Sequence, residues 1–189
     1  MSSFLLLKEP SRSTAFALAQ YCSRSGSFVS FDPNLRLPLW DLPAEARKVM
    51  LKMVSFTNIL RLNEEEAYFL TSKRSIEAAA RYLRSLGPSM VVITRGDEGC
   101  YLQTGAAETF VDGFSVRAVD TTGCGDAFLA GFLYALAKSP SKPEEMNKLE
   151  LKKIGRFANA VGALTAMKYG VIPALPKLAN VHKFLKVHP

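Results

Sequence analysis

Short apolar runs alternate with segments of helical periodicity through the first half of the chain. The apolar runs lack polar alternation, which is typical of parallel strands that are buried on both faces. Each is followed by a longer segment whose apolar residues recur at helical spacing. This order predicts an α/β fold with a mainly parallel sheet. The predicted strands are 3–7, 28–31, 59–62 and 90–94, and the predicted helices are 13–25, 44–56, 64–70 and 76–86.

The pattern changes after Thr94. Residues 100–103 and 108–111 are short apolar runs that flank a turn-like stretch, which predicts a hairpin and an antiparallel edge. Helices are predicted at 126–138, 149–168 and 177–187, and Pro140 and Pro143 require a loop between the first two. The length of 189 residues suits one domain with one core, so we expect residues 1–189 to form a single domain.

Composition excludes several classes of protein. The chain is 48% hydrophobic and 22% charged, and its longest apolar run, 127–137, is well short of the roughly 20 residues of a membrane-spanning helix. Residues 4–7 have no preceding basic residue and no cleavage site, so we expect no signal peptide and a cytoplasmic protein without membrane partners.

The cysteines and the basic residues argue against further classes of site and partner. Cys22, Cys100 and Cys124 are spaced for neither a disulfide framework nor a metal site, so we expect free thiols. The net charge is +7, but the basic residues are scattered, which argues against nucleic acid and suits an anionic ligand such as a nucleotide.

A glycine turn at 120–126 carries the most specific chemistry. Its sequence is Asp-Thr-Thr-Gly-Cys-Gly-Asp, and an apolar helix follows at once. A Gly-x-Gly turn at a helix start brings bare N–H groups together with the positive end of the helix dipole, which suits a phosphoryl group. Asp126 at that end could accept a proton from an attacking hydroxyl. The alternative is that Asp126 merely caps the helix.

The turn resembles the second signature of the ribokinase-like, or PfkB-type, carbohydrate kinase family, Asp-Thr-x-Gly-Ala-Gly-Asp, with Cys124 in place of alanine. The resemblance implies a ribokinase-like three-layer sandwich. It also implies phosphorylation of a sugar hydroxyl by ATP and Mg²⁺. In that reading Asp126 is the general base, and the amides of Gly123, Cys124 and Gly125 form the anion hole.

The segment Asn63-Glu64-Glu65-Glu66 resembles the family's Asn-x-x-Glu motif. The resemblance implies that Asn63 helps to bind the nucleotide phosphates and that Glu66 organises Mg²⁺ through water. The other interpretation is an acidic first helical turn that the helix dipole favours.

Two further segments resemble nucleotide-binding parts of the family. Residues 94–99 match its Thr-x-Gly-x-x-Gly loop, which implies that Thr94, Gly96 and Gly99 lie near the phosphates; a plain tight turn would need the same glycines. The small-residue segment 157–163 matches the part that lies against adenine, with Asn159 as its polar contact. Small residues could equally serve close helix packing.

Substrate and cation contacts are implied by two loops. Residues 168–173 match a loop that encloses a monovalent cation such as K⁺ together with Asp120 in relatives, although Ala174 replaces the expected polar ligand. Residues 30–40 resemble fructokinases and 2-keto-3-deoxygluconate kinases. Within them, Arg36 could contact phosphate or sugar oxygens or be an ordinary exposed arginine, and Trp40 is expected to pack.

In relatives, the segment 30–40 lies near the middle of the chain. The resemblance therefore implies that the N-terminal strands, much of the sugar pocket and the β-sheet lid are missing, and that activity needs a complementing N-terminal half. The expected ligands are a small sugar and ATP, and a homo-oligomer is a further candidate partner. The rival interpretation is a nucleotide-binding or partner-binding remnant without catalysis. A dinucleotide-dependent oxidoreductase is excluded because no Gly-x-Gly-x-x-Gly follows the first strand.

Overall fold

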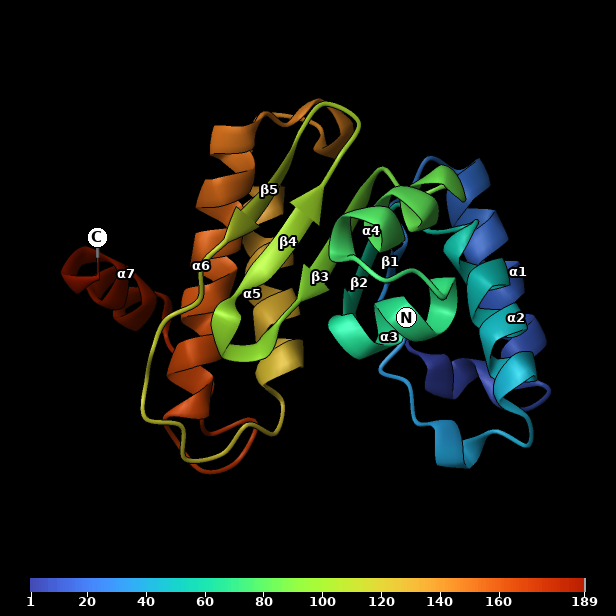
Figure 1. Cartoon of the computed structure of the whole chain (residues 1–189), viewed down its shortest axis with the longest axis horizontal. Coiled ribbons are helices and arrows are strands. Elements are labelled where there is room, and N and C mark those ends of the chain that lie inside the picture. Colours follow the sequence, from blue (N-terminus) through green and yellow to red (C-terminus); the bar gives the residue numbers. More distant parts are fainter. Residues whose placement is uncertain (189) are drawn as a thin grey trace. The chain divides into compact units, whose positions relative to one another are not determined.

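The computed structural model describes residues 1–188, which form two compact units (Figure 1). The first unit comprises Met1–Ile93 with Gln103–Gly105, and the second comprises Thr94–Leu102 with residues 106–188. The single-domain organisation stays a prediction.

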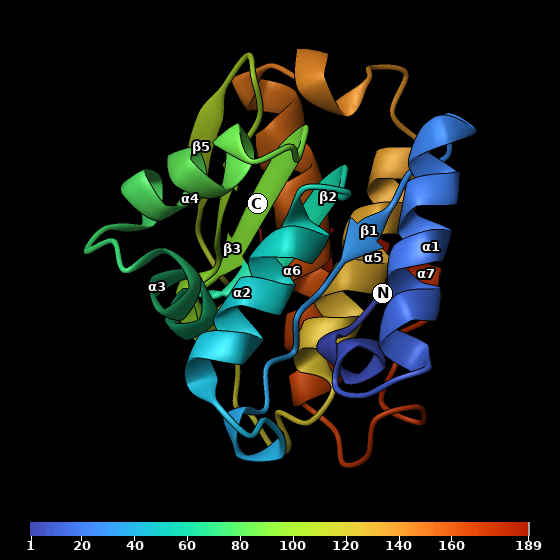
Figure 2. The same cartoon turned by 90° about the vertical axis from the view of Figure 1, so that its right-hand side faces the viewer.

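The first unit alternates strands and helices as its apolar pattern predicts. Its strands are ordered β1-β2-β3, and β1 and β2 are parallel, with Ser30 opposite Ile59 and Phe31 opposite Leu60 (Figure 2). The strands are β1 (Ser30–Phe31), β2 (Ile59–Asn63) and β3 (Met90–Thr94). The helices are α1 (Ser11–Arg24), α2 (Pro43–Val54), α3 (Glu64–Thr71) and α4 (Ile76–Ser85), with short 3-10 turns at Ser3–Leu6 and Leu37–Leu39.

The core of the first unit explains why these strands are so apolar. The residues 90–93 of β3 are fully buried, as are Leu60 and Leu62 of β2. Met50 and Met53 of α2 are buried as well. Strands covered on both faces need apolar side chains at consecutive positions, which is the pattern that predicted them.

The strand predicted at 3–7 is wrong. Ser3–Leu6 is a 3-10 helix, and only Ser2 pairs with Asp32, through an isolated parallel bridge. Leu6 is 1% exposed whereas Phe4 is half exposed, so Leu6 and the small Ser3 are buried and no alternating row of apolar side chains is. The carbonyl groups that would continue a ladder at Leu6 and Leu7 are taken instead by Arg12.

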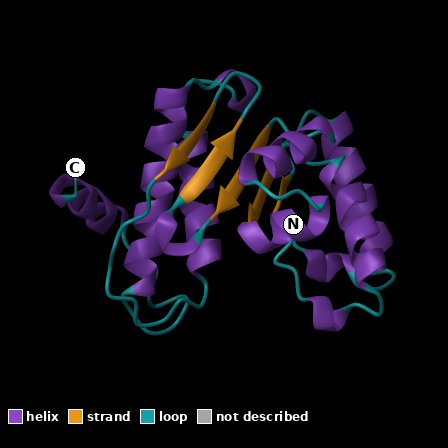
Figure 3. Cartoon of the chain, viewed as in Figure 1, coloured by secondary structure: helices purple, strands orange, loops and turns teal. Residues whose placement is uncertain are grey.

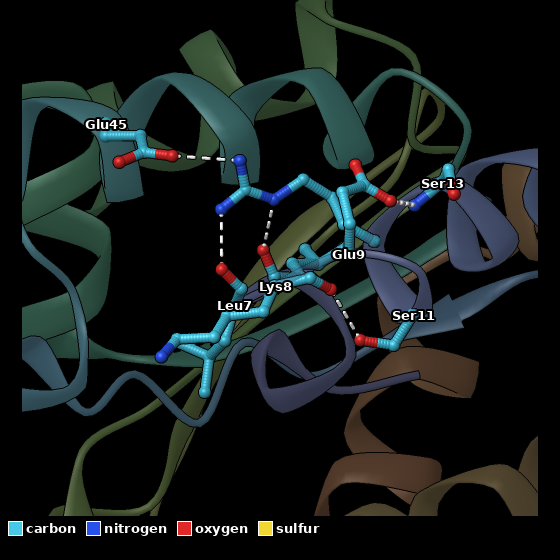
Figure 4. Close-up of polar contacts among 8 residues, drawn as sticks. Leu7, Lys8, Glu9, Ser11, Ser13 and Glu45 are labelled. Carbon is cyan, nitrogen blue, oxygen red and sulfur yellow. Dashed lines mark hydrogen bonds and ion pairs between the residues drawn. The ribbon is translucent and has the colours of Figure 1, made fainter.

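Arg12 joins three segments of the first unit. Its partners Leu7 and Glu45 are labelled in Figure 4. Its Nε donates to the Leu6 carbonyl at 2.6 Å and its Nη2 to the Leu7 carbonyl at 2.7 Å. Its Nη1 pairs with Glu45 of α2 at 2.8 Å. The guanidinium also lies 5.7 Å from the ring of Trp40, which is buried, as expected for a packing residue.

We expect Arg12→Ala to lower the free energy of unfolding by about 2 kcal/mol, because two part-buried carbonyls and Glu45 lose their donor. Urea unfolding monitored by circular dichroism measures this change in the free energy of unfolding. Arg24→Ala, at the exposed last turn of the same helix, is the matched control and should cost no more than about 0.5 kcal/mol. Equal losses in the two variants would contradict the role of Arg12.

The second unit consists of a hairpin and three helices (Figure 3). The predicted hairpin is confirmed: β4 and β5 are neighbours and run in opposite directions in Figure 1. Helix α6 contacts α5 most extensively and also contacts β5 and α7. The strands are β4 (Cys100–Gln103) and β5 (Glu108–Val111). The helices are α5 (Cys124–Ala137), α6 (Lys148–Ala166) and α7 (Leu178–Val187), with 3-10 turns at Gly96–Glu98 and Pro143–Glu145.

Small residues allow the close packing of α6. A Cβ on Gly155 would lie 2.7 Å from a Leu102 methyl, and a Cβ on Gly131 of α5 would lie 2.8 Å from a methyl of Val161. Close packing therefore requires glycine at one position of α6 and at one position of the neighbouring α5. Across residues 1–188 the cysteines are free thiols, and none of the helices is long and apolar enough to cross a membrane.

Candidate active site

The glycine turn in the second unit leads into the start of α5. Gly123 precedes the helix with φ +76°, in the left-handed region that glycine adopts at no steric cost. A Cβ at this position would also lie 2.4 Å from Cγ1 of Val171. Backbone conformation and close packing both require glycine here.

The first turn of α5 keeps backbone N–H groups available. No side chain caps this end of the helix. The Cys124 N–H donates to the Thr121 carbonyl at 3.2 Å, so this predicted member of the anion hole is already engaged. Within the described residues, the N–H groups of Gly125 and Asp126 have no acceptor. The Asp126 N–H was missed from the sequence, although its place at the third residue of the helix signals it.

The carboxylate of Asp126 is exposed and makes no hydrogen bond or ion pair with any residue of 1–188. Glu66 and Glu150 occupy the same third position of α3 and α6, and both carboxylates there accept the N–H of the residue that caps the helix. A capping acid would make the same bond at α5. Asp126 does not make it, so its carboxylate is available to a ligand.

Asp120 organises the glycine turn. Its Oδ1 accepts the Thr122 N–H at 2.9 Å, and its Oδ2 accepts the Gly170 N–H at 3.1 Å, across 50 residues of sequence. The hydrogen bonds from Thr122, and then the one from Gly170, lower the pKa of Asp120. Oδ1 thus braces the turn itself, and Oδ2 joins the turn to the loop at 168–173. A cation contact by Asp120 stays a prediction.

The thiol of Cys124 lies in the glycine turn beside Asp120. Its Sγ lies 3.8 Å from the Asp120 carbonyl oxygen. Burial, followed by the negative charge of Asp120, raises the pKa of the thiol. The thiolate is the reactive form of cysteine, so the raised pKa makes this thiol less reactive than a free one.

The two glycines of the loop at 94–99 have different surroundings. Gly99 has φ +98°, and a Cβ there would lie 2.1 Å from the carbonyl oxygen of Val111. A Cβ on Gly113 would likewise lie 2.0 Å from the carbonyl oxygen of Asp97. Gly96 has φ +62° with nothing within 4 Å of the corresponding position. Packing of backbone on backbone therefore fixes Gly99, whereas Gly96 faces open space that a ligand could occupy.

Thr94 and Asn159 are both buried. The Asn159 amide nitrogen donates to the carbonyls of Val111 at 3.1 Å and Asp112 at 2.9 Å. Burial raises the pKa of the neighbouring Cys100 thiol to about 12, and a hydrogen bond with Asn159 opposes the shift. Asn159 thus holds the end of β5, and its contact with a nucleotide stays a prediction.

In the first unit, Asn63 and Glu66 form a reciprocal cap at the start of α3. The Asn63 side chain accepts the Glu66 N–H at 2.8 Å, and Glu66 Oε2 accepts the Asn63 N–H at 2.8 Å. Glu66 Oε1 accepts the Leu35 N–H at 2.6 Å. Burial raises the pKa of Glu66, while the backbone hydrogen bonds from Asn63 and Leu35 oppose the shift. Both oxygens are therefore engaged, and the magnesium role stays a prediction.

Arg36 lies beyond the end of β1 in the first unit. Its guanidinium is exposed and contacts only the adjacent Leu35 carbonyl, at 3.1 Å, within the described residues. Nearby, Asp32 and Arg61 form a buried ion pair at 3.0 Å. Residues 1–188 contain no group of three or more His, Cys, Asp and Glu side chains that could hold a metal ion.

The predicted site residues thus fall into two groups. The first unit brings Glu66 together with Asn63 and holds the segment that carries Arg36. The second unit holds the glycine turn, the loop at 94–99 and Asn159. The members of the second group are Thr94, Gly96, Gly99, Asp120, Gly123, Cys124, Gly125, Asp126 and Asn159.

Comparisons with known proteins agree with these motifs. Residues 1–178 match the pfkB family carbohydrate kinase pattern. The chain is 38% identical over 186 residues to a probable fructokinase-2 of Arabidopsis thaliana, an alignment that covers 98% of this chain and 56% of the relative. The chain thus spans little more than half of this relative's length.

Solved structures show the same fold. A fructokinase from Vibrio cholerae with fructose, ADP and a calcium ion bound superposes with a TM-score of 0.88 at 34% identity, over 98% of this chain and 59% of that one. Aminoimidazole riboside kinase from Salmonella enterica gives a TM-score of 0.85 at 30% identity, over 98% and 61%. The predicted ribokinase-like α/β fold is confirmed, and the chain belongs to the pfkB family of carbohydrate kinases.

Proposed function

We propose that this chain transfers the γ-phosphoryl group of ATP to a hydroxyl group of a sugar, with fructose as the first candidate. The observation that carries the proposal is the unengaged carboxylate of Asp126 beside the free N–H groups at the start of α5. A base and an anion-binding helix end on one turn supply two of the elements that phosphoryl transfer uses.

In this mechanism Asp126 accepts the proton of the sugar hydroxyl while that oxygen attacks the γ-phosphorus. The bond from phosphorus to the bridging oxygen breaks, and ADP leaves with the electron pair. The N–H groups of Gly125 and Asp126 donate to the transferring phosphoryl oxygens, helped by the positive end of the helix dipole. Mg²⁺ enters as part of the substrate MgATP and neutralises phosphate charge.

The remaining residues serve binding. The open space at Gly96 suits the approach of a phosphate to the backbone. The exposed guanidinium of Arg36 suits sugar or phosphate oxygens, because its planar fork donates to two oxygens at once. We propose fructose because the Vibrio relative is a fructokinase and the Arabidopsis relative is named a probable fructokinase. The Salmonella relative, which acts on aminoimidazole riboside, supplies the competing acceptor.

A second candidate is nucleotide binding without turnover. It is favoured by one observation, that the chain spans 56% of the Arabidopsis relative and 59% of the Vibrio one. The sugar contacts of those proteins need not all have counterparts in these 189 residues. Binding and turnover therefore have to be measured separately.

We expect the chain to bind MgATP weakly and to phosphorylate fructose well below the typical enzyme rate of about 10 s⁻¹. Isothermal titration with millimolar MgATP measures binding. Phosphorus NMR with fructose, aminoimidazole riboside or 2-keto-3-deoxygluconate as acceptor measures transfer. A separately expressed N-terminal half of a relative should raise the rate, because it supplies acceptor contacts.

The outcomes separate the candidates. Binding with transfer to a sugar supports the kinase, and binding without transfer, with or without the added half, supports the second candidate. If MgATP gives no heat of binding and no thermal shift in a sample shown to be folded by circular dichroism, both candidate functions are excluded.

A further inference from the structure

The carboxylate of Glu66 joins the ends of two parallel strands in the first unit. Strand β1 is parallel to β2, so the carboxyl ends of the two strands lie at the same edge. Helix α3 follows β2 without a loop, which places Glu66 in its first turn at that edge. From there Glu66 accepts the N–H of Leu35, a residue 31 positions earlier, at 2.6 Å. Its other oxygen accepts the Asn63 N–H at the end of β2.

The segment that Glu66 holds contains a left-handed turn. Asn34 has φ +44°, a conformation that asparagine tolerates better than most residues. The anchored amide of Leu35 follows directly, and Arg36 comes next. Hydrogen bonds from N–H groups to an ionised carboxylate are about twice as strong as those between neutral groups. Glu66 therefore fixes the backbone one residue before the exposed guanidinium.

The other end of the turn is fixed as well. Asp32, two residues before Asn34, pairs with Arg61 of β2 at 3.0 Å, and the two side chains are 9% and 11% exposed. Breaking a buried ion pair is costly, so this contact is a firm anchor. The turn from Asp32 to Arg36 thus lies between a buried ion pair on one side and Glu66 on the other.

We propose that Glu66 is a positioning residue, which holds the Asn34–Arg36 turn so that the Arg36 guanidinium meets the oxygens of the sugar substrate. The identity of this ligand rests on the proposed function. Holding the turn before the ligand arrives removes an ordering cost from binding. A magnesium-organising Glu66 would instead affect the metal dependence of ATP binding.

The test is Glu66→Gln in the 189-residue chain. Glutamine offers one oxygen and one NH₂ group, so one of the two backbone donors loses its acceptor. We expect amide exchange in the peptide containing Leu35 to quicken by about tenfold or more. We expect the Kd for fructose to rise by about tenfold, as in Arg36→Ala, and the Mg²⁺ dependence of ATP binding to change less than about twofold.

Glu65→Gln is the matched control, since Glu65 is exposed in the same helical turn and loses the same charge. It should alter none of the three measurements. Adding Glu66→Gln to Arg36→Ala should weaken fructose binding little further, because both act through one guanidinium. Should Glu66→Gln not fold, Asn34→Val disturbs the same turn without touching Glu66 and should reproduce the loss.

Unchanged exchange at Leu35, additive losses in the double variant, or a shifted Mg²⁺ dependence would each overturn the positioning role. Absence of fructose binding by the unaltered chain would count against the proposed function and the assigned ligand. The exchange of Leu35 would then still decide whether Glu66 holds the turn.

Discussion

Replacing Asp126 by asparagine is expected to lower the rate of phosphoryl transfer to fructose by about 10² to 10⁴-fold. Asparagine keeps the size of the side chain but cannot accept a proton from the attacking hydroxyl. MgATP binding should persist or tighten slightly, because a negative charge beside the phosphate site disappears. Phosphorus NMR measures turnover, with the N-terminal half of a relative added where the rate of the chain alone is too low. Isothermal titration measures the affinity for MgATP.

Glu150→Gln is the matched control for this substitution. Glu150 occupies the same third position of α6 and makes the capping bond that Asp126 lacks. The control should therefore lose about 1 kcal/mol of stability or less and keep its turnover. A near-normal rate in Asp126→Asn would show that Asp126 is not the general base. Lost turnover together with lost MgATP binding would point to a damaged site and not to a missing base.

Elements determined by local sequence were predictable. β2 and β3 are read correctly because strands buried on both faces need consecutive apolar residues. Helices α3 and α6 start at asparagines whose side chains cap them, a signal contained within four residues. The segment at 3–7 carries an equally apolar pattern but becomes a 3-10 turn. The carbonyls of Leu6 and Leu7 bind Arg12, which no apolar pattern records.

The candidate site also contains features set by local sequence and features set by partners far away along the chain. The turn at 120–126 is one short stretch, so its glycines and the position of Asp126 follow from local sequence. The roles of Glu66 and Asn159 depend on partners that are 31 and up to 48 residues away. Spacing along the chain gives no sign that both side chains bind backbone groups. Motif resemblance therefore located these residues without revealing their hydrogen bonds.

The glycines at 96 and 99 show most clearly what a sequence motif cannot predict. The loop at 94–99 contains two glycines that the motif treats alike, yet of the two only Gly99 lies against another backbone, that of residues 111–113. The motif cannot distinguish a glycine required by protein packing from one that leaves space for a ligand. A Cβ added to each position makes the distinction, and it leads to opposite expectations for the same substitution.

Gly99→Ala is expected to destabilise the protein by about 3 kcal/mol or more. Its φ of +98° strains any residue with a side chain, and the new Cβ would lie 2.1 Å from the Val111 carbonyl oxygen and 2.5 Å from the Gly113 nitrogen. These neighbours are backbone atoms and cannot rotate away. The loop and the end of β5 would have to separate. Urea unfolding monitored by circular dichroism gives the change in the free energy of unfolding.

Gly96→Ala is the matched control, because the same methyl group is added three residues earlier in the same loop. Its φ of +62° costs about 1 kcal/mol for alanine, but nothing lies within 4 Å of the new Cβ. Gly96→Ala should therefore fold almost normally and weaken MgATP binding, if a phosphate approaches the open backbone there. Gly99→Ala should act mainly on stability. Similar unfolding free energies for the two variants would mean that the loop does not lie against residues 111–113 in solution.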